Sequence, residues 1–365
     1  MACKSLDAQV VRPEDPELAR LLNGFVPVRL TSMKGVDLNL FRFDYDQTFA
    51  ILMMDADGAT YSRFGSNDEK SDAGRMSVAG LKHAMEAVLA RHARSQRTSS
   101  PPAGTPRNRP AAFTIADYPK FARTKTAQQS CYHCHYANDA RFLQARAEGT
   151  FRKALLFQYP FPENIGVTLE TDRNNEVKAV LTRSAAEAGG VKARDRIVSA
   201  NSVPIHTSAD LQFALNSVAE PGSVVLEVER GGKLSGPLTL ALRAGWRRSD
   251  ISWRPSQGGI PPTVGLWAVP LTAVQKTERG LPVESMALRI SFLFPGPEAA
   301  RSRGDLKPDD VIVGINGRST PAMNTRQFHA YFHVNFNVGD TVTLNVLRGS
   351  KRLDVPVPCV ELPGE

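Results

Sequence analysis

The stretch ARDRIVSANS, residues 193–202, decides the fold of much of this chain because it occurs twice. At an offset of 115 residues the chain reads PDDVIVGING, residues 308–317, with the same order of acidic, aliphatic and turn-forming positions. The correspondence continues at this offset to Gln212-Phe213 and Gln327-Phe328. The chain therefore contains two copies of one structural module.

Each copy carries further motifs. The second copy contains VGL at 264–266, PGPEAA at 295–300 and LKPDDVI at 306–312. The first copy contains NIGV at 164–167 and SAAEAGGV at 184–191. Both copies resemble PDZ domains of the kind attached to bacterial envelope proteases. The resemblance covers about half of the chain and implies, in each copy, a partly open β-barrel with two helices.

The PDZ resemblance implies peptide binding by strand addition, in which an extended peptide pairs with a strand edge and a glycine loop holds its terminal carboxylate. Glycine allows the loop backbone to approach that carboxylate closely. The sequence leaves open whether the chain's own segments fill one or both grooves. The predicted peptide-binding residues are those of the two loops and two positions on the second helix of the first copy: Ile165, Gly166, Val167, Leu211, Leu215, Val264, Gly265 and Leu266.

Composition and motifs exclude several other classes. The chain has 365 residues and a formal charge of +8, with basic clusters at 91–109 and 247–254. No nucleic-acid-binding module accompanies these clusters, so we expect no nucleic-acid partner. No apolar run approaches the ~18 residues that a membrane-spanning helix needs. No serine lies in a nucleophile motif with an identifiable histidine partner, which predicts that the two copies are adaptors rather than parts of a protease.

Residues 131–135 read CYHCH, which has the C-x-x-C-H form of a haem attachment site. Cys131 and Cys134 could bond covalently to the vinyl groups of haem c, and His135 could ligate its iron. Three other roles stay open. The cysteines could act in thiol or disulfide chemistry, or they could be purely structural. Zinc could also be held with help from the distant His329 and His333.

The first hundred residues predict a mixture of helices and strands. Asp-Gly at 57–58 favours a tight turn between two strands, and Ser77 is a typical residue to cap the helix that follows it. The predicted elements are a helix at 15–22, strands at 25–30, 48–54 and 60–64, and a helix that begins after Ser77.

The same residues resemble thioredoxin-like domains of the thiol:disulfide interchange type. The segments CKSLD at 3–7, DPELARLLN at 15–23 and FVPV at 25–28 match the part of that family that follows its C-x-x-C motif. The resemblance implies that Cys3 is the second, resolving cysteine and that the attacking residue falls just before Met1. The chain as given is then expected to be inactive in dithiol exchange. The alternative is a degenerate domain with a lone Cys3.

The whole arrangement resembles a family of bacterial thioredoxin-like/PDZ proteins, some of which are selenoproteins. We therefore predict a multidomain α+β protein. Its predicted parts are a thioredoxin-like domain without its first strand (1–95), a Pro/Ser/Arg-rich linker (96–112), a C-x-x-C-H segment (113–160), a first PDZ domain (161–245), a tryptophan-rich joint (246–262) and a second PDZ domain (263–361).

The resemblance implies a thiol or selenol–disulfide redox function in the bacterial envelope. The PDZ domains would bind client peptides or protein C-termini, and haem would pass electrons to an electron-transfer partner. The alternative is a non-enzymatic PDZ scaffold that binds peptides and carries a vestigial thioredoxin-like domain. A periplasmic location is expected although no signal peptide is visible, because the leader would be lost with the missing start of the first domain.

Overall fold

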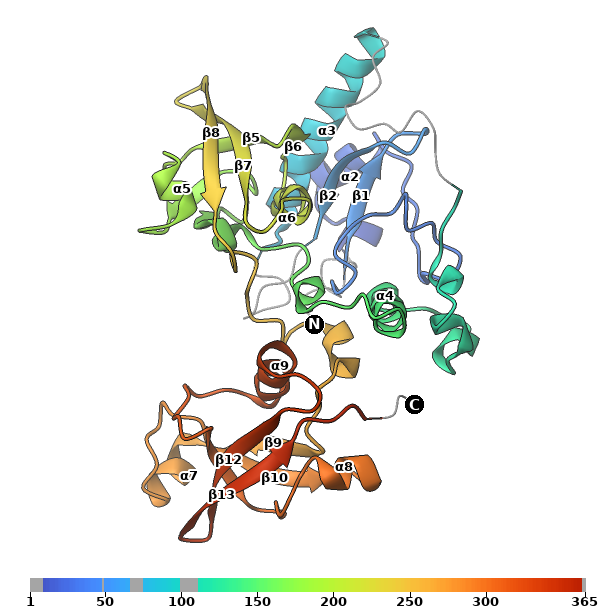
Figure 1. The fold of residues 1–365 in the computed structure, drawn as a ribbon. Helices are drawn as coiled ribbons and strands as arrows, with labels where there is room; N and C mark the ends of the chain where they lie inside the picture. Colours follow the sequence, from blue (N-terminus) through green and yellow to red (C-terminus); the bar gives the residue numbers. More distant parts are fainter. Residues whose placement is uncertain (1–8, 48, 66–74, 99–110, 363–365) are drawn as a thin grey trace. The chain divides into compact units, whose positions relative to one another are not determined.

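The computed structural model describes residues 9–47, 49–65, 75–98 and 111–362. The chain forms two compact units, Met1–Ser249 (unit 1) and Asp250–Glu365 (unit 2) (Figure 1). The division falls inside the predicted tryptophan-rich joint, and Trp246 belongs to the hydrophobic core of the first copy in unit 1. The other domain boundaries stay predictions. Every helix in the described ranges is too short or too polar to cross a membrane.

The repeated stretch forms the same strand and turn in both copies. It contains β5 (Arg196–Ala200) in the first copy and β11 (Val311–Ile315) in the second. Each strand ends at an asparagine in the left-handed region, Asn201 with φ 46° and Asn316 with φ 53°. Asparagine tolerates this conformation better than most residues, so the turn is encoded locally in both copies.

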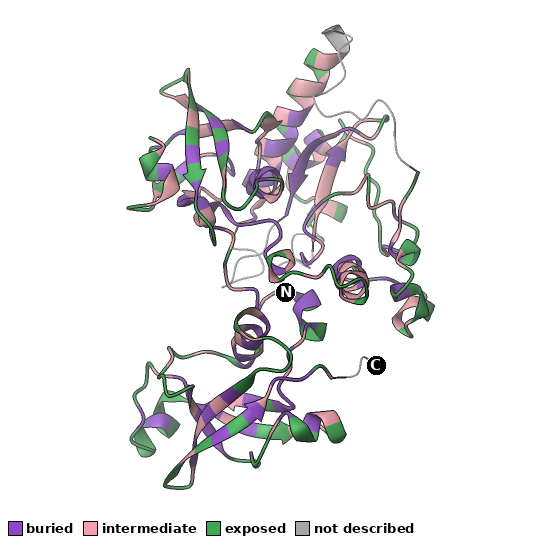
Figure 2. Cartoon of the chain, in the orientation of Figure 1, coloured by how far each residue is buried: buried purple, intermediate pink, exposed green. Residues whose placement is uncertain are grey.

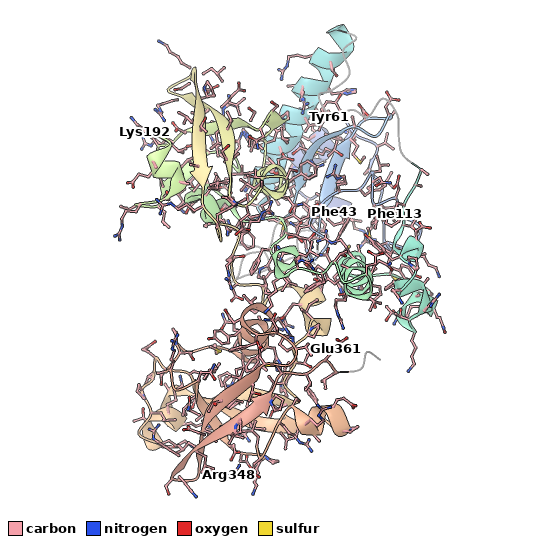
Figure 3. The ribbon with its side chains drawn as sticks, in the orientation of Figure 1. Phe43, Tyr61, Phe113, Lys192, Arg348 and Glu361 are labelled. Atoms are coloured by element: carbon pink, nitrogen blue, oxygen red, sulfur yellow. The ribbon has the colours of Figure 1, made fainter. Side chains whose placement is uncertain are left out.

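A buried aspartate in each repeated stretch joins three segments. Asp195 and Asp310 are at most 1% exposed. Two hydrogen bonds from Arg230 reach Asp195, both at 2.7 Å, and two from Arg348 reach Asp310, at 2.7 and 2.8 Å. The backbone N–H of Lys192 also donates to Asp195, at 2.8 Å; Lys192 and Arg348 are labelled in Figure 3. Buried charges persist when they are paired and hydrogen-bonded in this way, so the stretch carries the same structural constraint in both copies.

The first copy is built from two sheets and two helices. Strands β3 and β4 pair with each other, and the other four strands form a sheet in the order β6-β5-β7-β8. Buried and exposed residues alternate along β7, as expected when one face of a strand packs on a core. The elements are β3 (Val167–Leu169), β4 (Val177–Val180), α5 (Ala185–Ala188), β5, β6 (Val203–Pro204), α6 (Ser208–Asn216), β7 (Gly222–Arg230) and β8 (Lys233–Leu242).

The second copy forms one antiparallel sheet in unit 2, in the order β13-β12-β11-β10-β9. Strand β9 is therefore at an edge of this sheet. The elements of unit 2 are η6 (Pro255–Gly259), β9 (Leu266–Pro270), α7 (Ala273–Glu278), β10 (Leu288–Leu293), α8 (Pro297–Arg301), β11, α9 (Thr325–Asn335), β12 (Thr341–Arg348) and β13 (Lys351–Pro358).

The second helices of the two copies, α6 and α9, correspond at an offset of 117 residues. Their N-caps are Thr207 and Asn324, and Leu211 and Phe328, four positions after each cap, are both 0% exposed. The sequence correspondence at an offset of 115, which paired Phe213 with Phe328, is therefore wrong by two residues. The chain between strand and helix is two residues longer in the second copy, and a constant offset misses this.

The N-terminal part of unit 1 confirms several predicted elements. Asp15 caps the predicted helix by accepting hydrogen bonds from the N–H groups of Glu17 and Leu18, and Ser77 accepts one from the N–H of Gly80 at 2.9 Å. The strand predicted at 48–54 is shorter. The elements are α2 (Pro16–Leu22), β1 (Ile51–Met54), β2 (Thr60–Phe64) and α3 (Val78–Thr98).

The strand predicted at 25–30 is wrong, because these residues form no strand in the structure. Val26 and Val28 are 90% and 78% exposed, and Pro27 between them has no N–H for a ladder. In the described ranges, the N-terminal part holds a single two-stranded sheet, β1-β2. The thioredoxin-like fold that the resemblance implied is therefore not found.

The segment that carries the C-x-x-C-H motif is mostly short helices. It packs on residues 33–45 through a hydrophobic cluster that includes Phe43, Ile115 and Phe121. Its elements are η1 (Ile115–Asp117), η2 (Phe121–Arg123), η3 (Thr126–Gln128), α4 (Tyr136–Ala147), η4 (Lys153–Leu156) and η5 (Pro162–Ile165).

Candidate peptide-binding sites

The glycine loop of the first copy has a backbone that only glycine fits. Gly166 has a φ of 90° and ends η5. A Cβ atom at this position would lie 2.1 Å from the Cβ of Ser184. Both the left-handed backbone and the close approach therefore require glycine here. The predicted loop neighbours Ile165 and Val167 are 0% exposed and lie in the core of the first copy.

The glycine loop of the second copy packs against α8. A Cβ atom on Gly265 would lie 2.4 Å from the carbonyl oxygen of Ala299. The N–H of Gly265 donates to Ser302 Oγ at 2.7 Å, and the N–H of Leu266 donates to the carbonyl of Val264 at 2.7 Å. A peptide carboxylate that uses these two N–H groups must therefore replace acceptors that the loop already has.

The edge of β9 that does not pair with β10 lies beside α9. Ile290, which is opposite Ala268, directs its N–H and C=O to Asp310 and Asp309, on the side of β11. In an antiparallel ladder, both residues of such a pair direct their N–H and C=O groups away from each other. The N–H and C=O of Ala268 therefore face away from β10. The C=O of Ala268 accepts a hydrogen bond from Thr325 Oγ1 at 2.6 Å, and Thr325 is the first residue of α9.

Two aromatic rings bridge β9 and α9. The imidazole of His329 stacks on the indole of Trp267, with 5.5 Å between ring centroids and 25° between planes. Trp267 is 42% exposed, and Nε2 of His329 is buried with no hydrogen-bond partner in the described part of the chain. For His329 and His333 the sequence predicts either a metal site or one ring in the groove and the other on the surface. It gives no role to Trp267, although an aromatic residue directly after VGL was the available signal.

Acidification is expected to destabilise unit 2 through His329. Burial lowers the pKa of His329 from 6.5 to about 4. The unfolded chain then binds more protons between these values, so the stability that the neutral imidazole contributes is present above pH 6.5 and is lost as the pH falls toward 4. We expect urea unfolding of unit 2 to show a loss of up to about 3 kcal/mol from pH 7 to pH 4.

The matched variant is His329→Gln, because the first copy has Gln212 at the corresponding helix position. This variant should remove most of the pH dependence of unit 2 between pH 7 and pH 4. An equal pH dependence in the variant and the wild type would contradict the assignment of the effect to His329.

Helix α6 of the first copy does not present the two leucines that we predicted to line a groove. Leu211 and Leu215 are 0% exposed and lie in the hydrophobic core of that copy. An amphipathic helix directs such residues inward, so they support the fold. The side of α6 that turns away from this core carries Phe213 and is covered by other parts of unit 1.

Strand β2 lies directly against α6. The carboxylate of Asp210 accepts hydrogen bonds from Ser62 Oγ at 2.7 Å and from the N–H of Arg63 at 2.8 Å. Thr207 Oγ1 donates to the carbonyl of Arg63. The guanidinium of Arg63 stacks 3.5 Å from the ring centroid of Phe213. The chain's own residues therefore cover the outward side of α6.

The C-x-x-C-H motif has its histidine at the start of α4, as predicted. Nδ1 of His135 lies 2.9 Å from the Asp139 carboxylate, an arrangement that leaves Nε2 for a ligand and fits an iron-ligating histidine. Cys131 is exposed and Cys134 is half-buried, and both are free thiols. Burial raises the pKa of Cys134. The haem c expectation for Cys131, Cys134 and His135 stays a prediction.

The zinc alternative finds no support in the structure. In the ranges that the structure describes, no group of three or more His, Cys, Asp and Glu side chains is arranged to hold a metal ion. His333 is buried, with Nδ1 3.1 Å from the carbonyl oxygen of Pro262. Cys3, the predicted resolving cysteine, lies outside the described residues.

Comparison with known proteins identifies the class of one part of the chain. A family model described as a PDZ domain matches residues 176–230, which run from β4 through β7 of the first copy. The chain therefore contains a PDZ domain.

Two relatives are bacterial proteases. This chain is similar to the periplasmic pH-dependent serine endoprotease DegQ of Escherichia coli, with 31% identity over 149 residues, 40% of this chain and 29% of DegQ. It is also similar to a probable periplasmic serine endoprotease DegP-like of Pseudomonas savastanoi pv. phaseolicola, with 30% identity over 147 residues, 39% of this chain and 29% of the relative. The chain thus spans less than a third of the length of these relatives.

Solved structures of the same kind also match in part. The HtrA-type protease AlgW with decapeptide is 17% identical, with a TM-score of 0.24, over 41% of this chain and 52% of that chain. The HtrA3 PDZ domain bound to the phage-derived ligand FGRWV is 31% identical, with a TM-score of 0.16, over 19% of this chain and 60% of that chain. TM-scores at this level add nothing to the fold described above.

These matches correct the predicted function. The thiol or selenol redox function is wrong, because the relatives are named as serine endoproteases and the matching family model is a PDZ domain. The matches favour the stated alternative, a protein that binds peptides through PDZ domains. The selenoprotein resemblance and the electron-transfer partner find no support in these matches.

Proposed function

We propose that this chain is a bacterial extracytoplasmic adaptor that binds extended peptides, including carboxyl termini, in the groove between β9 and α9 of the second copy. The observation that carries the proposal is that β9 is an edge strand of the five-stranded sheet, with α9 beside it. A peptide that adds to this edge gains backbone hydrogen bonds, and the side chains along the groove then set its specificity.

Helix α9 has the burial pattern that a groove wall needs. Phe328 and Phe332 are 0% exposed and fix the inner face in the core of the second copy. Arg326 on the outer face is exposed, and His329 lies between these faces beside Trp267. A peptide that enters the groove must separate Trp267 from His329 and break the hydrogen bond from Thr325 to Ala268, so binding reports on these contacts.

The protease activity of the relatives is not part of the proposal, because the match covers only 29% of each relative. Their periplasmic location supports the extracytoplasmic assignment.

The test is fluorescence anisotropy with labelled FGRWV peptide, either with a free carboxylate or with an amidated end, titrated with the full chain. Ala268→Pro is the decisive variant, because proline removes an N–H that faces the groove and no N–H that β9 gives to β10. We expect saturable binding by the wild type and at least about tenfold weaker binding by Ala268→Pro, which corresponds to one lost hydrogen bond.

The control is Trp267→Phe, which keeps a ring over His329 and the same backbone. Its affinity should stay within about fivefold of the wild type, since aromatic pairs are worth about 1 kcal/mol. Equal affinities of Ala268→Pro and the wild type would show that the peptide does not add to β9. A weaker affinity for the amidated peptide would identify the carboxylate as part of the ligand.

A further inference from the structure

The second helices of the two copies differ in what surrounds them. On α6, Ser208, Asp210 and Gln212 are at most 3% exposed, and Ala209 is 7% exposed. Figure 2 shows α6 as almost wholly buried. On α9, the residue that corresponds to Ala209 is Arg326, which is exposed. The same helix of the same module is therefore enclosed in the first copy and open on one side in the second.

The enclosure consists of specific polar contacts with strand β2. Asp210, which is 1% exposed, accepts hydrogen bonds from Ser62 and from the N–H of Arg63 in β2. It accepts a third hydrogen bond, at 3.2 Å, from the N–H of His206 in the first copy. The guanidinium of Arg63 lies 3.9 Å from this carboxylate. Separating β2 from α6 would leave this buried carboxylate without these partners, which is costly.

A second N-terminal segment packs against η5 and the loop between β3 and β4. The carbonyl of Arg75 accepts a hydrogen bond from the Asn174 side chain at 3.0 Å, and the Arg75 guanidinium pairs with Glu163 at 2.8 Å. At the start of α3, a Cβ on Gly80 would lie 2.7 Å from the carbonyl oxygen of Thr171. Segments on both sides of residues 66–74 thus pack against the first copy.

We infer that the first PDZ copy does not bind external peptides, because unit 1 already encloses the positions of α6 that correspond to Thr325 and His329, and that the chain takes one peptide, in the second copy. These positions are Ser208 and Gln212, which are 3% and 1% exposed. The contacts that enclose α6 are intramolecular, and such contacts have effective concentrations on the order of millimolar, so a free peptide at micromolar concentration opens the enclosure poorly. This division between the copies goes beyond the proposed function.

The test measures how fast thiols introduced into the full chain react with a labelling reagent. After proteolysis, mass spectrometry measures the label on each fragment separately, so the native cysteines do not interfere. Ala209→Cys places a thiol on the enclosed side of α6, and Arg326→Cys places one at the corresponding position of α9. We expect Ala209→Cys to be labelled at least about 100-fold more slowly than Arg326→Cys, because it reacts only when β2 opens. Rates within about threefold of each other would overturn the inference.

A second variant tests whether β2 is the part that blocks access. Ser62→Ala, added to Ala209→Cys, removes one hydrogen bond to Asp210 and should raise the labelling rate about tenfold, while it leaves the rate of Arg326→Cys unchanged. No increase would show that another segment covers α6 and would overturn the role of β2.

A titration with peptide separates this inference from the proposed function. Calorimetric titration of the full chain with FGRWV should give one peptide per chain, and a stoichiometry of two would overturn the inference. If no peptide binds, the proposed function fails, and the labelling rates still decide whether α6 is enclosed.

Discussion

Replacing Asp210 by alanine is expected to lower the free energy of unfolding of unit 1 by about 3–5 kcal/mol. The carboxylate is 1% exposed and accepts hydrogen bonds from Ser62, the N–H of Arg63 and the N–H of His206. Burial raises the pKa of Asp210 and lowers the pKa of Arg63. The charge of each partner opposes the shift in the pKa of the other, and alanine leaves the Arg63 guanidinium buried without its carboxylate.

The measurement is urea unfolding of the full chain in a background where Trp253 and Trp267 of unit 2 are replaced by phenylalanine, so that Trp246 is the probe of unit 1. Gln327→Ala is the matched control, since Gln327 takes the position of Asp210 in α9 and bonds to Asp250 in unit 2 at 2.9 Å. It should cost unit 2 no more than about 1.5 kcal/mol, the value of an ordinary hydrogen bond. An Asp210→Ala loss no larger than that would show that β2 and α6 are only loosely joined.

The contact between β2 and α6 also shows where sequence reasoning stopped. Local signals were readable. Asn201 and Asn316 encode the turn after the repeated strand, and Asp15 caps the helix that begins at Pro16. Ser62 and Asp210 are 148 positions apart. Nothing in the two short segments that hold them indicates that they meet.

The misplaced groove residues have a related cause. The apolar pattern of α6 identified a helix, but Leu211 and Leu215 are equally consistent with a groove and with a core until the side that faces the sheet is known. The structure assigns them to the core. In the second copy the groove contacts come from Thr325 and His329, whose polar character gave no apolar signal to follow.

The failed thioredoxin resemblance has a different origin. It depended on short segments, CKSLD and FVPV, of which the first lies outside the described residues and the second is exposed irregular chain. Short matches of this kind carry little information about packing, whereas Asp195 and Asp310 are buried carboxylates at the same position of the repeat, and each pairs with an arginine. The resemblance that rested on a buried constraint held, and the one that did not failed.

Replacing Gly265 by alanine is expected to weaken peptide binding by about 10- to 100-fold, the loss of one or two hydrogen bonds to a charged group. The new Cβ would lie 2.4 Å from the carbonyl oxygen of Ala299 and 2.6 Å from Ser302 Oγ. Because the first of these atoms is backbone, the loop itself must move away from α8. That movement displaces the N–H groups of Gly265 and Leu266, which would hold the carboxylate.

Gly166→Ala is the matched variant in the first copy, and it is the harsher substitution. Its Cβ would lie 2.1 Å from the Cβ of Ser184, and its φ of 90° is strained for alanine. It should therefore cost unit 1 about 1–3 kcal/mol and yet leave the affinity for FGRWV unchanged. Displacing a loop lowers the affinity only if that loop holds the peptide carboxylate. Weaker binding after Gly166→Ala, with no loss after Gly265→Ala, would therefore place the peptide site in the first copy and not in the second.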